Sequence, residues 1–254
     1  MSVKSKIAIV TGGSRGLGRD MVINLAKKGN NIIFTYNSNK DEADKVVAEV
    51  TAMGQKAIAY QLDVSAMKNL DTFVVQVSQH LQEHEGAPNF DFLINNAGVG
   101  LYGSVTETTE ETFDTLMNIH FKGVYFLTQK LLPLLNDGGR IVNISSGLTR
   151  ISFPNVSAYA SMKGAIETYT RSLAKELGAR QITANSIAPG AIATDFGGGT
   201  TKSDENKRNA VAAITALGRV GEPEDIGGVV AFLCTPEAGW VNGQRIELSG
   251  GMMI

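Results

Sequence analysis

The sequence predicts an α/β fold built on one doubly wound parallel sheet with helices on both faces. Two observations support this prediction. Short apolar runs alternate with helix-like segments along most of the chain, and a repeated strand-then-helix order is typical of parallel sheets. The runs are continuous stretches rich in Val, Ile and Ala, without polar alternation, which indicates strands that helices cover on both sides.

Strands and helices are expected to alternate from the N-terminus onward. In the first half of the chain, the expected strands cover Ile7–Val10, Asn31–Tyr36, Lys56–Leu62 and Phe90–Asn95. Helix-like segments follow at 16–28, 40–53 and 67–83, and a long helical region ends at Asn136. In the second half, strands are expected at Ile141–Ser145, Ile182–Ile187 and Gln244–Leu248, with helices at 157–179 and 223–235. No linker or shift in composition divides this series, so we expect a single domain over residues 1–254.

One stretch of the second half stands apart because it contains three adjacent glycines at 197–199. Glycines weaken regular structure, so the segment 195–204 is a candidate mobile loop. We interpret the region at about 194–215 as a mobile lid over a substrate pocket. A plain surface connection is the alternative.

Charge and hydropathy limit the classes of partner. Lys and Arg number 23 against 25 Asp and Glu, so the net charge of −2 lacks the basic excess that drives binding to nucleic acids or anionic membranes. No apolar stretch approaches the ~20 residues of a membrane span. The only cysteine, Cys234, lies in an apolar run and is expected to be a buried hydrophobe. We therefore expect a cytoplasmic enzyme that acts on a small molecule.

A glycine-rich loop follows the first expected strand and opens the first helix. Glycine makes up 28 of the 254 residues, and the segment 11–18 has the spacing Gly-x-x-x-Gly-x-Gly. In this context the backbone N–H groups of such a loop can approach a pyrophosphate. The cofactor contacts expected here are Gly12, Ser14, Arg15, Gly16, Leu17 and Gly18. The alternative is a glycine turn that serves only the steric needs of the chain.

The end of the second expected strand indicates which nicotinamide cofactor would bind. An NAD site usually places Asp or Glu there to bind the ribose 2′-hydroxyl. Here the first acidic residue is Asp41, and Arg15, Asn37 and Ser38 could together hold a 2′-phosphate. The pattern favours NADP(H), with an ordinary polar turn and an exposed arginine as the alternative.

Two further strand ends are expected at the same edge of the sheet, where ligands of such folds bind. Asp63 and Val64 follow the third strand and could frame an adenine. Asn95, Ala97 and Gly98 close the fourth strand, where small residues would let the backbone approach a ribose. Turn formation alone would also explain these residues.

Four polar residues are candidates for catalysis. Tyr159 and Lys163 are four residues apart and share one face of their expected helix. A nearby ammonium group lowers the pKa of a phenol from its ordinary value of ~10, which suits a proton donor. Ser146 follows a strand end, and Asn118 lies in the expected long helix, where an amide suggests a polar role.

These motifs together resemble the short-chain dehydrogenase/reductase family. The residues that carry the resemblance are the loop at 11–18, Asn-Asn-Ala-Gly at 95–98, Asn118, Ser146, the Tyr-x-x-x-Lys pair at 159–163, and Pro189-Gly190 followed by Thr194. They stand in family order from about residue 6 to the C-terminus.

The resemblance implies a single Rossmann-type domain and a role for each of these residues. Tyr159 would be the general acid/base, and Lys163 would lower its pKa and bind the nicotinamide ribose. Ser146 would position the carbonyl oxygen, and Asn118 would hold a water that connects Lys163 to solvent. Nicotinamide contacts would come from Pro189, Gly190, Ile192 and Thr194. The resemblance also implies a lid after Thr194 and a homotetramer.

Other chemistries fit the sequence less well. His80 and His84 have the spacing of a zinc-peptidase helix, but Leu81 stands where that motif needs Glu, so no metal site is expected. His120 is expected to be a hydrogen-bonded residue near the pocket.

The substrate is narrowed but not fixed by the sequence. The segment 217–226 is similar to 3-oxoacyl-carrier-protein reductases, yet the segment 131–137 lacks the basic residues that such enzymes tend to carry at the pocket mouth. We predict an NADPH-dependent reductase of a small or medium ketone, with 3-oxoacyl thioesters as one candidate class. A sugar or polyol dehydrogenase working oxidatively is one alternative, and a non-catalytic NADP(H)-binding sensor is another.

Overall fold

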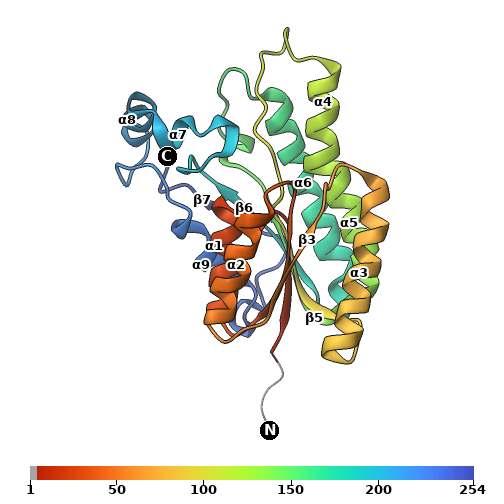
Figure 1. Ribbon diagram of the computed structural model, residues 1–254. Helices are drawn as coiled ribbons and strands as arrows, with labels where there is room; N and C mark the ends of the chain where they lie inside the picture. Colours follow the sequence, from red (N-terminus) through yellow and green to blue (C-terminus); the bar gives the residue numbers. More distant parts are fainter. Residues whose placement is uncertain (1–4) are drawn as a thin grey trace.

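The computed structural model describes residues 5–254 and is built around one parallel sheet of seven strands (Figure 1). Residues 1–4 of the expected single domain lie outside the described residues. The strands lie in the order β3-β2-β1-β4-β5-β6-β7 across the sheet. Their bounds are β1 Ile7–Val10, β2 Asn31–Tyr36, β3 Ala57–Gln61, β4 Phe90–Asn95, β5 Leu135–Ile144, β6 Thr183–Pro189 and β7 Arg245–Leu248. The predicted fold class is confirmed.

Helices connect successive strands and cover both faces of the sheet. The longer helices are α1 Gly16–Lys27, α2 Lys40–Ala52, α3 Met67–Glu85, α4 Glu110–Met117, α5 Gly123–Leu131, α6 Ser157–Glu176, α8 Glu205–Ala213 and α9 Glu224–Leu233. Short segments are η1 Asn118–Lys122, η2 Leu132–Leu134, η3 Gly147–Thr149, η4 Gly178–Arg180, η5 Phe196–Gly198, α7 Thr200–Ser203 and η6 Pro236–Ala238. Figure 1 shows α1, α2 and α9 on one side of the sheet and α3, α5 and α6 on the other.

Two apolar cores lie on the two faces of the sheet, and alternate residues of the central strand β1 supply both. In β1, Ala8 and Val10 pack with α1, α2 and α9, whereas Ile7 and Ile9 pack with α3, α5 and α6. All four side chains are buried. Since both faces of the strand need apolar residues, the run of Ile, Ala, Ile and Val is continuous.

The sheet changes direction at β1. This strand pairs with β2 on one side and with β4 on the other, so chain connections run outward from it in opposite directions. A crevice forms at such a switch point outside the carboxyl ends of the strands, and ligands of open parallel sheets bind there. The glycine loop therefore lies where a nucleotide site is expected.

The predicted long helical region before Asn136 is wrong in its extent. The helix begins only at Glu110, where the Thr109 side chain accepts a hydrogen bond from the backbone N–H of Thr112, and η1 interrupts it with π-helical turns. Helix α5 ends at Leu131, and β5 already begins at Leu135, six residues before the predicted start. The early strand pairs out of register, with a shift between Phe90 and Phe92 on β4, which a simple apolar-run criterion misses.

The expected lid region contains short helices rather than one loop. Segments η5, α7 and α8 cover most of 194–215, and α7 and α8 lie at the end of the sheet away from the N-terminus (Figure 1). Gly197, Gly198 and Gly199 all have positive φ, between 61° and 85°. The glycines thus allow a sharp turn between two helical segments.

Within residues 5–254, no helix is long and apolar enough to cross a membrane. The same residues contain no group of three or more His, Cys, Asp and Glu side chains that could hold a metal ion. Cys234 is buried, as the sequence predicts, and burial raises the pKa of its thiol to about 12.

Candidate active site

The glycine loop is held closely against the second strand. Gly12 and Gly16 have φ of 67° and 52°, a conformation that favours glycine. The backbone N–H of Gly12 donates to Thr35 Oγ1 at 3.1 Å, and that of Gly13 donates to the Thr35 carbonyl at 2.8 Å. A Cβ on Gly18 would overlap the Gly12 carbonyl. The loop is therefore a fixed shape that only glycines permit at these positions.

The N-terminus of α1 has no side-chain cap and no acidic residue in its first turn, as is also true of α3 and α6. Arg15 stands at the N-cap of α1. In contrast, α2, α4 and α8 have side-chain caps and acidic first turns. The N–H groups of the first turn of α1 are thus available to an anion such as a pyrophosphate.

Three side chains predicted to read a 2′-phosphate lie at the surface near this loop. Arg15 is exposed at the start of α1, and Asn37 and Ser38 are exposed directly after β2. The first acidic residue, Asp41, lies in the first turn of α2. The strand end therefore carries donors and no carboxylate.

Hydrogen bonds between Thr11 and the segment at Asn96 join the end of β1 to the end of β4, and the sequence did not single them out. Thr11 Oγ1 accepts from the backbone N–H groups of Asn96 at 2.9 Å and Ala97 at 3.0 Å. The Asn96 amide donates in return to the carbonyls of Thr11 at 2.9 Å and Gly12 at 3.1 Å. Both residues stand in the recognised motifs, but their pairing across the sheet is visible only in the fold.

Asn95 lies in the interior rather than toward the crevice. Its amide donates to Thr128 Oγ1 at 3.1 Å and to Asn143 Oδ1 at 2.8 Å, and the Asn143 amide donates to Thr170 Oγ1 at 2.9 Å. All four residues are buried. The side chain of Asn95 therefore ties β4 and β5 to the helices behind them, and the structure does not bring it together with the other predicted cofactor contacts.

The turn after β3 packs against the π-helical segment. Asp63 Oδ1 accepts from the backbone N–H of Ser65 at 2.9 Å and from its hydroxyl at 2.7 Å. The next residue, Val64, is buried, and a Cβ on Gly123 would overlap its carbonyl. Gly123 thus lets α5 approach the strand end that is expected to frame the adenine.

Asn118 begins the π-helical segment η1, at the point where α4 ends. The backbone N–H of Gly123 bonds to the Asn118 carbonyl, five residues back. Such π-bulges disturb the ordinary helical bonding and occur often at functional sites. The polar role that the sequence suggests for Asn118 is therefore matched by an irregular backbone at this residue.

His120, on the same segment, is buried against the catalytic candidates. Its Nε2 lies 2.8 Å from the Val99 carbonyl, as expected of a hydrogen-bonded histidine, and its Nδ1 has no partner among the described residues. The ring meets the Tyr159 ring edge-on, with centroids 5.1 Å apart. A Cβ on Gly98 would lie 2.7 Å from His120 Cε1, so Gly98 makes room for this ring.

Ser146, Tyr159 and Lys163 come together at the ends of β5 and α6, and all three are buried. The Ser146 hydroxyl lies near enough to Tyr159 to lower the pKa of the phenol, and it accepts a hydrogen bond from the backbone N–H of Leu148 at 3.2 Å. Lys163 Nζ lies 5.7 Å from the centre of the Tyr159 ring and donates to the Ile144 carbonyl at 2.7 Å.

Burial sets the protonation of this group. It raises the pKa of Tyr159, while the nearby Ser146 hydroxyl lowers it in part. It also lowers the pKa of Lys163 to about 7 and that of His120 to about 3, with the charge of Lys163 as a further cause. At neutral pH Tyr159 thus carries its proton and His120 is neutral. The sequence-based expectation that Lys163 lowers the pKa of Tyr159 stays a prediction.

The remaining predicted contacts lie at the end of β6 and in the segment after it, and one of them, Thr194, lies beside the glycine loop. The backbone N–H of Gly190, after Pro189, donates to the Leu248 carbonyl at 2.9 Å. Ile192 forms a bridge with Gly221. The methyl group of Thr194 is 3.6 Å from the position of a Cβ on Gly16. The start of the expected lid therefore lies beside the loop.

Aromatic side chains lie against Tyr159. The rings of Tyr102 and Phe196 both meet that of Tyr159 edge-on, each with centroids 6.0 Å apart. Gly197 lies against Tyr102, since a Cβ there would be 2.9 Å from its ring. This wall is suited to flat apolar molecules.

Known proteins resemble this chain along nearly its whole length. A family model described as enoyl-(acyl carrier protein) reductase matches residues 12–253. The hydroxynaphthalene reductase-like protein Arp2 of Metarhizium brunneum is 39% identical over 264 residues, covering 98% of this chain and 96% of that protein.

Two solved structures share the fold closely. The angucycline C-6 ketoreductase LanV, with bound NADP, is 36% identical with a TM-score of 0.92, covering 98% of this chain and 95% of that one. A short-chain dehydrogenase/reductase from Serratia marcescens is 33% identical with a TM-score of 0.91, covering 100% of both chains. Matches of this length and identity, together with the geometry above, show that the chain belongs to the short-chain dehydrogenase/reductase family of oxidoreductases.

Proposed function

We propose that this protein uses NADPH to reduce a ketone to a secondary alcohol, and that the ketone is part of a flat, fused aromatic ring system. The observation that carries the proposal is the buried group of Ser146, Tyr159 and Lys163, with the rings of Tyr102 and Phe196 against Tyr159. Two relatives support it: LanV is a ketoreductase with bound NADP, and Arp2 is named as hydroxynaphthalene reductase-like.

The residues of the group have complementary roles in this reaction. NADPH, when bound, supplies the hydride that adds to the carbonyl carbon. The Ser146 hydroxyl donates to the carbonyl oxygen, where negative charge develops, and Tyr159 transfers its proton to that oxygen. Burial keeps Tyr159 protonated at neutral pH, which is the form that a reduction requires. Lys163 replaces the lost proton, with Asn118 holding a water that connects Lys163 to solvent, as the family resemblance implies.

The described residues fit the cofactor at two points. The uncapped first turn of α1 and the fixed glycine loop provide N–H groups for a pyrophosphate. Arg15, Asn37 and Ser38 provide donors for a 2′-phosphate, and a carboxylate that would repel it is missing from the end of β2. Asp63 and Val64 would frame the adenine. Ala97, Gly98, Pro189, Gly190, Ile192 and Thr194 would contact the ribose and nicotinamide.

The proposal includes the larger organisation of the enzyme. Residues 1–254 form one domain, and residues 194–215 act as a mobile lid over the substrate. By the family resemblance the protein is a homotetramer in the cytoplasm. Light scattering of the purified protein tests the tetramer, and a molar mass near the 27.0 kDa of one chain would contradict it.

The test is a panel assay that follows the loss of NADPH absorbance. Hydroxylated naphthalenones and anthraquinones are compared with 3-oxoacyl thioesters, short aliphatic ketones and keto-sugars. We expect kcat/KM for the fused-ring ketones to exceed that of every other class at least ~10-fold, which corresponds to ~1.4 kcal/mol of preferential transition-state binding.

A pair of aromatic variants tests the proposed ring wall. Phe196→Leu is expected to raise KM for the fused-ring ketone ~10-fold and to leave a short aliphatic ketone unaffected. Phe232→Leu is the control, because Phe232 is similarly exposed, at 46% against 41% for Phe196, and lies on α9.

Three outcomes contradict the proposal, once the panel is extended by sugars and polyols assayed with NADP+ and by a fluorescence titration of NADPH binding. A preference for 3-oxoacyl thioesters would replace the substrate class. Oxidation of a sugar or polyol with NADP+, without reduction of any ketone, would establish a dehydrogenase. Binding of NADPH without turnover of any compound would establish a sensor.

A further inference from the structure

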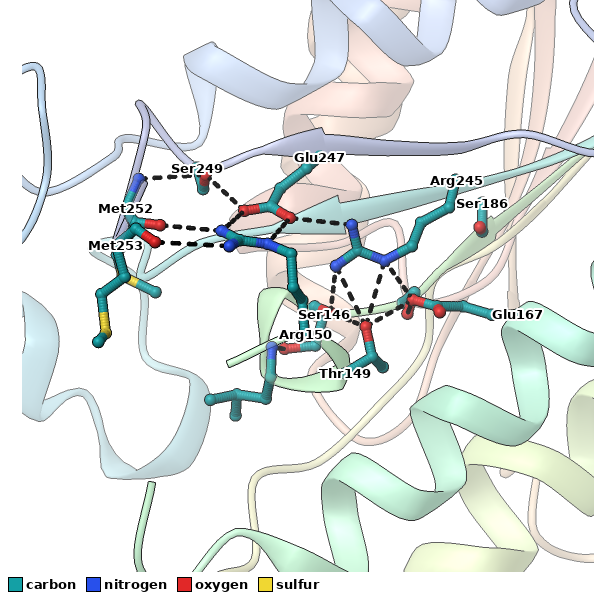
Figure 2. A network of polar contacts seen from close by, with 12 residues as sticks. Ser146, Thr149, Arg150, Glu167, Ser186, Arg245, Glu247, Ser249, Met252 and Met253 are labelled. Atoms are coloured by element: carbon teal, nitrogen blue, oxygen red, sulfur yellow. Dashed lines mark hydrogen bonds and ion pairs between the residues drawn. The ribbon is translucent and has the colours of Figure 1, made fainter. Parts of the chain in front are cut away.

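The segment that carries Ser146 is fixed by a cluster of charged side chains away from the reacting group (Figure 2). At its centre is the carboxylate of Glu167 on α6. One oxygen, Glu167 Oε1, accepts from Ser145 Oγ at 2.6 Å, and from Arg245 Nε at 2.7 Å. It also lies 2.7 Å from the Thr149 hydroxyl. One carboxylate thus contacts residues on both sides of Ser146.

Arg245 on β7 contacts the backbone of Ser146 itself. Its Nη2 donates to the Ser146 carbonyl at 3.3 Å and to Thr149 Oγ1 at 3.1 Å. Thr149 Oγ1 in turn lies 2.9 Å from the Ser146 carbonyl. The guanidinium therefore joins Glu167 to the peptide unit of the catalytic serine.

Arg245 is itself held in place from its other side. Its Nη1 donates to Glu247 Oε2 at 2.9 Å. Glu247 also accepts from Nε of Arg150 at 2.8 Å and from its Nη2 at 2.7 Å, and Arg150 Nη2 donates to the Met252 carbonyl at 3.0 Å. Two positive and two negative side chains thus alternate, and Figure 2 shows Arg245 between Glu167 and Glu247.

The position of the cluster links the Ser146 segment to the helix that carries Tyr159. Glu167 lies four residues after Lys163 and eight after Tyr159 on the same helix, so all three share one face. The same helix therefore carries the proton donor and the carboxylate that fixes the Ser146 segment. Through these contacts the distance between the hydroxyls of Ser146 and Tyr159 depends on Glu167 and Arg245.

The ion pair between Arg245 and Glu167 is expected to add little to the stability of the fold. The side chains of Arg245 and Glu167 are only 22% and 12% exposed, and a pair removed from water to this extent loses much of its Coulomb energy to desolvation. The value of such a pair lies in fixing a geometry, because charged hydrogen bonds are short and directional.

We propose that Glu167 and Arg245 are positioning residues that hold the Ser146 hydroxyl against Tyr159. The inference rests on the proposed function, since it takes Ser146 as the donor to the carbonyl oxygen. Neither residue is a catalytic residue, because both act through the backbone and neighbours of Ser146. Their loss should therefore matter only as long as the Ser146 hydroxyl is present.

A double-mutant cycle tests this dependence. Glu167→Gln, Ser146→Ala and the double variant are compared with the wild type for kcat, for KM of the ketone and for Kd of NADPH. We expect Glu167→Gln to lower kcat ~10- to 100-fold in the native background, as a small misplacement of a catalytic group does. In the Ser146→Ala background the same change should lower kcat less than ~2-fold, since the two changes remove one interaction. The Kd of NADPH should stay constant.

Two further variants distinguish the positioning role from a general loss of structure. Thr149→Val removes one hydroxyl of the cluster without changing its shape, and we expect it to lower kcat in the same background-dependent manner. Asp137→Asn is the matched control, because it breaks an ion pair with Arg180 at 2.7 Å, on residues outside the cluster. Its kcat should equal that of the wild type. Equal losses for Glu167→Gln in both backgrounds, or none in either, would overturn the proposal.

Hydrogen exchange supplies a readout that needs no turnover. The amides of 145–151 should exchange at least ~10-fold faster in Glu167→Gln than in the wild type, because the segment opens more easily. The amides of α1 should not change, nor should any in Asp137→Asn. If the wild type reduces no ketone, the proposed function fails, and this measurement still decides the positioning role. Unchanged exchange at 145–151 would overturn it.

Discussion

At the scale of single residues, the site depends on how burial sets protonation. Tyr159 and Lys163 are almost wholly buried, and burial disfavours the charged form of each. The phenol therefore keeps its proton, and Lys163 titrates near neutrality. A proton donor with a nearby group that can be reprotonated at pH 7 is what a ketone reduction needs.

The first prediction concerns the phenol. Tyr159→Phe should lower kcat ~100- to 10,000-fold, the usual effect of removing a general acid. The ring and its contacts with His120, Tyr102 and Phe196 remain, so the Kd of NADPH should change less than ~2-fold. Steady-state kinetics and fluorescence titration measure the two effects. Activity within tenfold of the wild type would remove Tyr159 from the proton transfer.

Single residues of the site also differ in how well the sequence predicts their positions. The types and spacing of Ser146, Tyr159 and Lys163 suffice to predict that they meet, and the structure brings them together. The partners of Asn95 and Asn96 could not be predicted, because neighbouring residues at a strand end face opposite ways and only the fold shows which faces the crevice. Glu167 and Arg245 were missed because their pairing joins residues 78 positions apart.

At the scale of elements, the π-helical segment η1 brings His120 into the interior. The ring is 1% exposed, one nitrogen bonds to Val99, and the other has no partner among the described residues. Burial disfavours a proton on His120, and the nearby charge of Lys163 disfavours it further, so the pKa of the imidazole falls to about 3. The π-helical segment thus places a neutral histidine against Tyr159.

This arrangement predicts an acid-sensitive stability. The unfolded chain binds a proton on His120 below pH ~6.5, whereas the folded chain does so only near pH 3. The unfolded state therefore binds more protons between these values, and the free energy of unfolding falls as pH decreases through this window. Relative to about pH 7.5, His120 should cost ~2 kcal/mol at about pH 5.

Urea unfolding of the wild type and His120→Gln at these two pH values measures this cost. The glutamine retains a donor for the Val99 carbonyl and does not titrate, so the variant should lose ~2 kcal/mol less than the wild type on acidification. Identical losses in the two proteins would show that another group governs the acid sensitivity.

At the scale of the whole molecule, the fold follows from the order of its apolar runs. Apolar runs predicted every strand of the sheet. The runs are continuous where helices cover both faces of a strand, whereas β7 alternates Arg245 and Glu247 with Ile246 and Leu248, which pack on one face only. The extent of β5 and the break at η1 could not be predicted, since a register shift and a π-bulge depend on contacts with β4 and with Val64. The observed pairing of β1 with both β2 and β4 makes β1 the switch point of the sheet and places the glycine loop and the end of β2 beside one crevice.

Because both parts of the proposed nucleotide site belong to the folded state, the nucleotide should stabilise the whole domain. NADPH at about 100 times its Kd should raise the free energy of unfolding by ~2.7 kcal/mol, as mass action requires for a ligand of the folded state. Thermal unfolding with NADPH or NADH measures the effect.

Variants at the end of β2 and the start of α1 should then separate the two nucleotides. Arg15→Ala should reduce the stabilisation by a fixed concentration of NADPH and leave that by NADH unchanged, since only NADPH has the 2′-phosphate. Asn37→Asp should reverse the preference, because a carboxylate repels the phosphate and binds the free 2′-hydroxyl. Arg19→Ala is the control: this arginine lies on the same helix but pairs with Glu49, so both nucleotides should stabilise the variant as they do the wild type. Equal weakening of NADPH and NADH by Arg15→Ala would mean that Arg15 supports the loop without contacting the 2′-phosphate.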